Sequence, residues 1–299
     1  MTYNEIASNK RKSVLLMTIF IALIILLGYV FSRASGDQSY GMVWVAIIFS
    51  LISTAISYYH GDKIALWSSG AKPIAKEDNA YVYRLVENLC IAEGVPTPHI
   101  YIIEDQAINA FATGRKPELA SVAVTRGAIE KLKNEELEGV LAHELSHVKN
   151  YDIRFMTLVA VMVGAVSILA NIFLRSRFFF GGRRRNNNDE GNQLMLVFMI
   201  IGIVLAILSP LIAELIKLAI SRKREYLADA SGALLTRYPE GLASALEKIQ
   251  AENIPMAHAS QATAHLFLAN PFQSKSFKSI FSTHPPIEDR IKRLRTMGV

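Results

Sequence analysis

The sequence predicts a mainly α-helical membrane protein with about four transmembrane helices and one α+β domain that contains a small sheet. Four apolar runs each approach the ~20 residues that a helix needs to cross the hydrocarbon core of a bilayer. Only 19% of the 299 residues are charged, below the ~25% that is typical of soluble domains. The segments outside the runs, 60–153 and 221–299, are together long enough to form one domain with its own core.

The charge and the cysteine content argue against a nucleic-acid partner and limit the kinds of metal site that the chain can form. The net charge of +6 fits the charge bias of a membrane protein better than a nucleic-acid-binding surface. No basic run interleaves with aromatic residues, so we expect no nucleic-acid partner. Cys90 is the only cysteine, which excludes an internal disulfide and a thiolate metal cluster. Any metal site in this chain must therefore use histidine and carboxylate ligands.

The first two apolar runs, 14–31 and 41–59, contain no charged residue and predict a hairpin of two transmembrane helices. A cleaved signal peptide is the alternative for the first run, but that run exceeds the usual length of about 7–15 apolar residues. The cluster of Lys10, Arg11 and Lys12 in front of it places the N-terminus in the cytoplasm. Two crossings then return the chain to the cytoplasmic side.

The second pair of runs, 155–174 and 194–213, also has the spanning length, but the loop between them carries five arginines. The positive-inside tendency opposes moving such a loop across the membrane, whereas the length and lack of charge of the runs favour two crossings. Two crossings and none both leave the flanking segments on the same, cytoplasmic side. The expected division of the chain has three parts: a transmembrane hairpin over 1–59, a cytoplasmic domain over 60–153 and 221–299, and a second hairpin with the Arg-rich loop over 154–220.

Local patterns predict the elements of the cytoplasmic domain. Apolar residues at helical spacing predict a helix over 78–94, which ends at a glycine. Runs rich in β-branched residues predict strands over 99–104, 108–114 and 121–127, and hence a small sheet. Asn134 is the expected N-cap of a second helix. Its apolar positions recur at helical spacing: Leu137, Val140, Leu141, Leu145 and Val148.

The stretch "LAHELSHVKNYD" on that second helix carries His143 and His147 one turn apart on one face, so both imidazoles can reach the same metal ion. A catalytic zinc needs three protein ligands and one open position. Glu225, which follows the fourth apolar run, is the candidate third ligand. Asp229 lies one turn further on and can orient a ligating imidazole through its free N–H. The alternative is that all four are ordinary solvated residues of helix surfaces.

A site of this kind predicts hydrolysis of a peptide bond with one Zn²⁺ per chain. Zinc lowers the pKa of water and polarises the scissile carbonyl, and Glu144 is placed to take the proton of the water and deliver it to the leaving amine. His284, in "STHPPIEDR", is the candidate hydrogen-bond donor to the oxyanion, with Arg290 as a supporting charge. The alternative for His284 is a loop histidine beside a diproline turn.

The chain resembles the HtpX-type membrane-bound zinc metalloproteases, in the family that also holds the CAAX prenyl endopeptidases. The resemblance covers nearly the whole chain and depends on four motifs in this order: "INAFATG", "LAHELSHVKNYD", "REYLADASGALL" and "STHPPIEDRI". It implies a zincin-like metalloprotease domain, with zinc on His143, His147 and Glu225 and with Glu144 as the base. Asn109, in the first motif, then lies on a strand that lines the cleft and binds an extended substrate by strand addition.

The resemblance further implies a role in membrane-protein quality control and the stress response, in the bacterial cytoplasmic (inner) membrane. The expected partners are the lipid bilayer and membrane-protein or unfolded polypeptide substrates; the oligomeric state stays open. Two other functions compete. A prenyl-protein endopeptidase would have more membrane helices than four apolar runs provide. A non-catalytic metal-binding scaffold would have no use for Glu144 next to a ligand.

Overall fold

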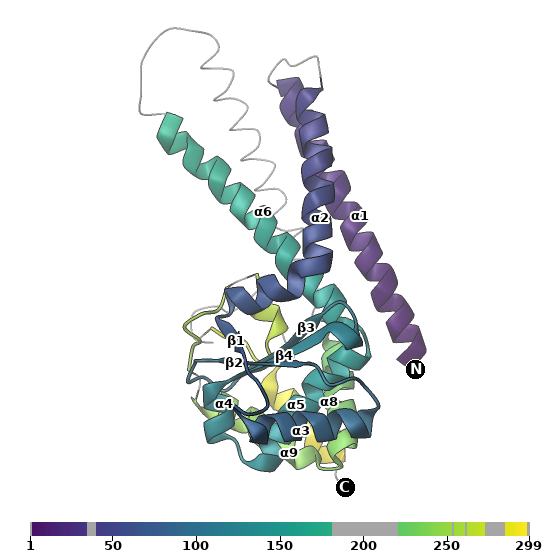
Figure 1. The fold of residues 1–299 in the computed structure, drawn as a ribbon, viewed down its shortest axis with the longest axis vertical. Helices are drawn as coiled ribbons and strands as arrows, with labels where there is room; N and C mark the ends of the chain where they lie inside the picture. The colour runs from purple at the N-terminus through teal and green to yellow at the C-terminus, as the bar shows by residue number, and fades with distance from the viewer. Residues whose placement is uncertain are drawn as a thin grey trace.

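The computed structural model describes residues 2–34, 40–180, 221–252, 254–260, 262–272 and 285–297. Three helices, α1 (Thr2–Ala34), α2 (Gly41–Ser68) and α6 (Asp152–Phe180), extend from a domain in which helices surround a small sheet (Figure 1). The mainly helical architecture with a small sheet, expected from the sequence, is confirmed.

Two helices of the described residues are long and apolar enough to span a bilayer, over Asn4–Arg33 and Gly41–Ser68. They contain the first two apolar runs. The third run lies in α6, which meets α5 (Asn134–Lys149) at an angle of 86°, and this bent pair counts as a further candidate only if it forms one span. The fourth run, 194–213, lies outside the described residues. The expected total of four transmembrane helices is therefore not confirmed.

Close packing joins α1, α2 and α6. Gly28 allows α1 to approach α2, because a Cβ at this position would lie 2.4 Å from the Cβ of Ala46. Side chains of all three helices form one buried apolar cluster: Leu16, Phe20, Ile24, Ala46, Phe155, Leu158, Val159, Met162, Val163 and Val166. The N-terminal half of α6 is thus tied to the membrane hairpin while its first residues join the domain.

The sheet has the strand order β1-β2-β4-β3, with β2 and β4 parallel and the other two pairs antiparallel. Its strands are β1 (Ala71–Pro73), β2 (His99–Ile103), β3 (Ala110–Gly114) and β4 (Ala120–Thr125). The three predicted strands are confirmed. The sequence did not predict β1, because three residues ending in proline show no alternating pattern. The last two residues predicted for β4 begin α4 (Arg126–Lys131), since the hydroxyl of Thr125 accepts the N–H of Ala128 and caps that helix.

One buried apolar core lies between the sheet and the helices, and residues on both sides of the second apolar pair contribute to it. The helices are α3 (Ala80–Glu93), α5, α8 (Arg222–Thr236), α9 (Pro239–Glu252) and α10 (Ile287–Met297). The expected N-cap of α5 was wrong by one residue. Lys133 occupies that position, and its N–H donates to the carboxylate of Glu136 at 2.7 Å.

Candidate active site

The candidate site is built on α5, whose apolar face fixes the direction of the opposite side chains. Leu137, Leu141 and Leu145 are fully buried in the core. His143 and His147 are buried as well, and their Nε2 atoms face each other at 3.2 Å. Both imidazoles therefore point at one position on the inner side of the helix.

A carboxylate from α8 closes the third side of this position. The Oε2 of Glu225 lies 3.8 Å from the Nε2 of His143, and its Oε1 lies 3.7 Å from the Nε2 of His147. One ligand atom from each of the three residues lies within 4.8 Å of the other two. The close approach of α8 to α5 depends on Gly232, where a Cβ would lie 2.9 Å from the backbone nitrogen of His143. The structure thus brings Glu225 next to His143 and His147, which lie 82 and 78 positions before it in the sequence.

Two carboxylates hold the imidazoles from behind. The Nδ1 of His143 lies 2.9 Å from the Oδ1 of Asp229, and the Nδ1 of His147 lies 3.0 Å from the Oδ2 of Asp152. Each carboxylate accepts a hydrogen bond from an Nδ1–H, so in the neutral imidazole each Nε2 presents a lone pair. Two such lone pairs and a carboxylate that face one point fit a divalent cation with nitrogen and oxygen ligands, such as zinc. The sequence suggested Asp229 but not Asp152.

Asp152 is in turn held by the first membrane helix. The Nδ2 of Asn9 donates to the Oδ1 of Asp152 at 2.6 Å and to the carbonyl of Asn150 at 3.0 Å. The guanidinium of Arg224 lies 3.6 Å from the same Oδ1. The exposed apolar side chains of α1 begin at Val14, one and a half turns or about 8 Å beyond Asn9 along the helix. The candidate site therefore lies directly beside the apolar part of the hairpin.

Arg290 is fully buried behind His143 and is engaged by Asp229. Its Nε and one terminal nitrogen donate to the two carboxylate oxygens at 2.9 and 2.7 Å, and the other terminal nitrogen donates to the carbonyl of Leu268 at 3.0 Å. Burial opposes the charge on Asp229, but the adjacent guanidinium holds the pKa of this carboxyl well below its usual range. Arg290 is therefore placed to fix Asp229.

The electrostatic environment of the site favours positive charge at its centre. Burial alone would lower the pKa of His147, but the hydrogen bond to Asp152 and the nearby Glu225 raise it to about 9. Glu144 is also buried, and desolvation raises its pKa although His143, His147 and the backbone N–H of Ala112 act against this. A carboxylate with a raised pKa next to an electrophilic centre is suited to accept a proton from water.

Asn109, just before β3, is buried and holds a remote segment of the chain. Its Nδ2 donates to the carbonyl of Ala269 at 3.0 Å, and its Oδ1 accepts the N–H of Ala269 at 3.3 Å. Phe111 pairs with Phe267 across the outer edge of β3, and the N–H of Leu268 donates to the carbonyl of Ala110 at 2.9 Å. The first half of this edge is therefore already paired. His284 lies outside the described residues.

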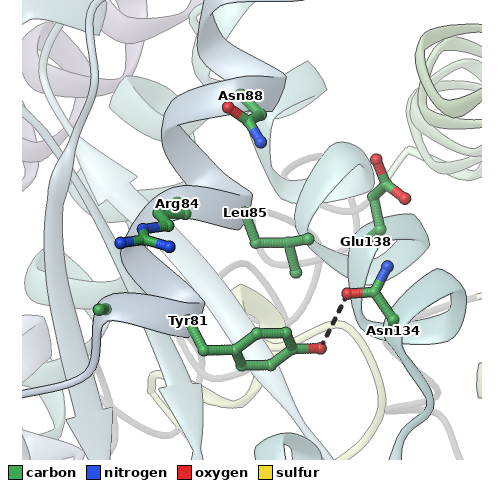
Figure 2. Close-up of a pocket in the computed structure, with 7 residues that line it drawn as sticks. Tyr81, Arg84, Leu85, Asn88, Asn134 and Glu138 are labelled. Carbon is green, nitrogen blue, oxygen red and sulfur yellow. Dashed lines mark hydrogen bonds between the residues drawn. The ribbon is translucent and has the colours of Figure 1, made fainter.

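A separate cavity of about 460 Å³ lies between α3 and the first turns of α5 (Figure 2). Tyr81, Arg84, Asn88, Asn134 and Glu138 line it together with apolar atoms, and the hydroxyl of Tyr81 donates to the side-chain oxygen of Asn134 at 3.1 Å. None of the residues around the paired histidines takes part. The cavity combines no set of metal ligands with a base, so it is not the candidate active site.

Comparison with known proteins places this arrangement in a family. The sequence profile of peptidase family M48 matches residues 76–298, which include both histidines, Glu144 and Glu225. This chain belongs to peptidase family M48. Its M48 relatives include a protease HtpX homolog of Caldanaerobacter subterraneus subsp. tengcongensis, 43% identical over 99% of this chain and 98% of the relative. Another HtpX homolog, of Thermoanaerobacter pseudethanolicus, is 46% identical over 99% and 97%.

The fold of this M48 protein is also found in a solved structure. The crystal structure of S. mikatae Ste24p superposes with a TM-score of 0.54 at 18% sequence identity, over 98% of this chain and 67% of that protein. At this identity the likeness shows the fold alone. Family and relatives together confirm the resemblance to HtpX-type proteases, and with the apolar helices they identify a membrane metalloendopeptidase.

Proposed function

We propose that this M48 protease is a zinc endopeptidase in which His143, His147 and Glu225 hold one zinc ion per chain. The observation that carries the proposal is the convergence of two Nε2 lone pairs and one carboxylate on a single buried position. Zinc prefers this set of nitrogen and oxygen donors, and a three-residue site leaves a fourth position open for substrate or water. The absence of a second cysteine leaves no thiolate alternative.

In this proposal Glu144 moves the proton. Zinc, when bound, supplies Lewis acidity for the attacking water and the scissile carbonyl. Glu144 follows His143 directly and lies beside β3, so its carboxylate accepts the proton of the water and then delivers it to the leaving amine. Asp152 and Asp229 keep the imidazoles oriented, with Arg290 behind Asp229. His284 is proposed as the donor to the oxyanion.

The substrate is proposed to bind as an extended strand along β3, the edge strand of the sheet. The pairing of Phe111 with Phe267 and of Ala110 with Leu268 leaves only the Ala112–Gly114 end for this purpose, unless the segment around Leu268 is displaced. This end is also the one that lies beside Glu144, through the N–H of Ala112. A substrate strand there would place a peptide bond next to the proposed base.

We infer that the substrates are membrane-protein or unfolded polypeptides and that the role is quality control in the bacterial cytoplasmic membrane. The position of Asn9 beside the site, about 8 Å from the exposed apolar part of α1, supports access for chains that emerge from the bilayer. The proposed division of the chain is the one expected from the sequence: the hairpin 1–59, the cytoplasmic domain 60–153 with 221–299, and a second hairpin 154–220.

A variant with Glu144 replaced by glutamine tests this proposal. Glu144→Gln keeps the size of the side chain but removes the base, so proteolysis of an unfolded reporter should fall by about 10²–10⁴-fold. The purified variant should still bind one zinc ion per chain, measured by elemental analysis. Full activity in this variant would exclude Glu144 as the base. Loss of both activity and zinc in Glu225→Ala, with an unchanged circular-dichroism spectrum, would support Glu225 as the third ligand.

A further inference from the structure

Three basic side chains alternate with tyrosine rings where the membrane hairpin meets the domain. The ammonium of Lys10 lies 4.5 Å from the centre of the Tyr151 ring, and the guanidinium of Arg154 lies 5.3 Å from the same ring. Arg154 also lies 5.8 Å from the Tyr58 ring. Together with the next two members they form what is called here the basic–aromatic band: Lys10, Tyr58, Tyr59, Arg115, Tyr151 and Arg154.

The remaining contacts add Arg115 and Tyr59 to the other four side chains, so that all six form one continuous row. Arg115 lies 4.8 Å from the ring of Tyr59 and 5.8 Å from that of Tyr58, and the two rings are packed edge to face. The Nε of Arg154 donates to the carbonyl of Arg115 at 2.7 Å, which fixes one guanidinium relative to the other. Stacking on aromatic faces within about 6 Å restrains cationic groups without neutralising them. The band is thus a pre-arranged set of positive charges.

The band lies at the boundary of the apolar surface. On α1, exposed large apolar side chains begin at Val14, after Lys10. On α2, they recur every few residues down to Ile56 and Tyr59, and beyond Tyr59 the only one that is exposed is Trp67. From Val14 to Ala34, and from Gly41 to Tyr59, each helix covers roughly 30 Å, which is the thickness of the hydrocarbon core. Figure 1 shows α1 and α2 side by side over this length, with the domain below. The band is therefore at the level of the lipid headgroups.

The positive charges of the band have no carboxylate partner among the described residues. Lys10, Arg115 and Arg154 form no ion pair there, and Asp62, which lines the same small cavity as the two arginines, is not within ion-pair distance of either. Two other basic residues of the domain are paired: Lys149 with Glu93, and Arg290 with Asp229. A guanidinium that lies over a ring and pairs with no carboxylate can donate to the oxygens of a phosphate group.

We propose that the basic–aromatic band is a binding site for the phosphate headgroups of anionic phospholipids in the leaflet that faces the domain. The tyrosines supply the amphipathic rings that settle at the membrane interface, and the three cations supply the charge that selects anionic over zwitterionic lipid. This site shares no residue with the candidate metal centre, although Lys10 directly follows Asn9 and Tyr151 directly precedes Asp152. It assigns the chain a lipid preference in addition to its insertion into the bilayer.

Lipid selectivity of the full-length chain tests the site. The Glu144→Gln protein, used to prevent self-cleavage, is reconstituted into phosphatidylcholine bilayers with a trace of spin-labelled phosphatidylglycerol or phosphatidylcholine. The fraction of label immobilised at the protein surface gives a relative association constant. We expect a preference for phosphatidylglycerol that falls about five-fold for each band charge removed, as in Lys10→Gln, Arg115→Gln and Arg154→Gln.

A matched control removes the same charge elsewhere. The control changes Arg84, Lys133 and Lys292 to glutamine. These exposed residues lie on α3, just before α5 and on α10, and Figure 1 shows α3 and the C-terminal end on the side of the domain opposite the hairpin. This triple variant should keep the preference. The proposal is overturned if the band variant retains the preference of the parent, or if the control loses it equally. Lys10→Gln alone, on an exposed helix position, keeps the test usable should the triple variant unfold.

Discussion

Asp152 and Asp229 each accept a hydrogen bond from the Nδ1 of one candidate ligand, which leaves both Nε2 lone pairs directed at the metal position. This arrangement selects one tautomer and one ring orientation for each histidine, so the ligands are ordered before a metal binds. The side chain of Asp229 is held by hydrogen bonds from the buried Arg290. The side chain of Asp152 is held by a hydrogen bond from Asn9 on the membrane hairpin. The two ligands therefore depend on different parts of the chain.

Replacing Asp152 by asparagine should weaken zinc binding by about 10–100-fold, because the uncharged amide no longer favours the required tautomer of His147. The measurement is zinc competition with a chelator on the Glu144→Gln background. Asp289→Asn, an exposed carboxylate on α10, is the control and should leave the affinity unchanged. An Asp152→Asn protein with parental affinity would show that His147 needs no partner behind it.

His265, which is not one of the candidate metal ligands, should make the free energy of unfolding depend on pH. Burial lowers the pKa of His265 from 6.5 to about 4, and its Nε2 donates to the carbonyl of Met156 at 3.0 Å. Between these two pKa values the unfolded chain binds a proton that the folded chain does not, so stability falls as the pH falls. We expect a loss of about 2 kcal/mol between pH 7 and pH 5. Thermal unfolding midpoints in detergent measure this, and His265→Gln should flatten the dependence; an equal slope in both proteins would contradict it.

At the scale of the elements, the site depends on how closely α8 can approach α5. Glu225 reaches the histidines because Gly232, two turns further along α8, packs directly on the backbone of α5 at Ala142 and His143. Backbone atoms cannot move aside as the end of a flexible side chain can. The distance between α8 and α5 is therefore set by the lack of a Cβ at Gly232 and not by the ligand residues.

Gly232→Ala should force α8 and α5 apart and move Glu225 away from both Nε2 atoms. We therefore expect the free energy of zinc binding, measured by chelator competition, to fall by more than the free energy of unfolding. The added Cβ would lie 2.9 Å from the His143 nitrogen and 3.2 Å from two neighbouring backbone atoms. Gly164→Ala on α6 is the matched control, because its Cβ would meet only the Cβ of Ala262 at 3.7 Å. Equal zinc affinity in the two variants would refute this account of the helix contact.

At the scale of the whole molecule, the metal position, the hairpin and the bend between α5 and α6 form one unit. Tyr151 has the positive φ of 58° that a non-glycine residue adopts only at a cost, and it turns the chain by 86° between the two helices. The turn places Asp152 behind His147 and directs α6 along α1 and α2. Membrane helices and active site therefore cannot be arranged independently.

The sidedness of the chain is tested with a cysteine at position 187, in the loop between the second pair of apolar runs. With Cys90 replaced by alanine, the Asn187→Cys protein should react with an impermeant thiol reagent on intact cells, because two charge-free runs of spanning length carry the loop outside. Cysteines placed at Lys12 and Arg237 should be protected, as expected for a cytoplasmic N-terminus and domain. Protection at position 187 would leave only the first hairpin spanning.

Helix periodicity and the length of the apolar runs were enough to predict the paired histidines and the first two membrane helices. The i, i+4 spacing alone puts His143 and His147 on one helix face, and the length of charge-free sequence alone predicts α1 and α2. The candidate third ligand, Glu225, followed from requiring both flanks of the second apolar pair to lie on one side. These inferences hold because helix geometry and bilayer thickness do not depend on the rest of the fold.

Only the tertiary structure decided that Asp152 stands behind His147, what holds Asp152 and Asp229 in place, and what occupies the sheet edge. Asn9 meets Asp152, Arg290 meets Asp229, and Leu268 meets Ala110, each across more than 60 residues of sequence. The basic–aromatic band likewise draws its residues from separate elements. Such contacts are set by helix crossing angles, by the bend at Tyr151 and by close approach at Gly232, all of which result from packing of the whole chain and leave no periodic signal in the sequence.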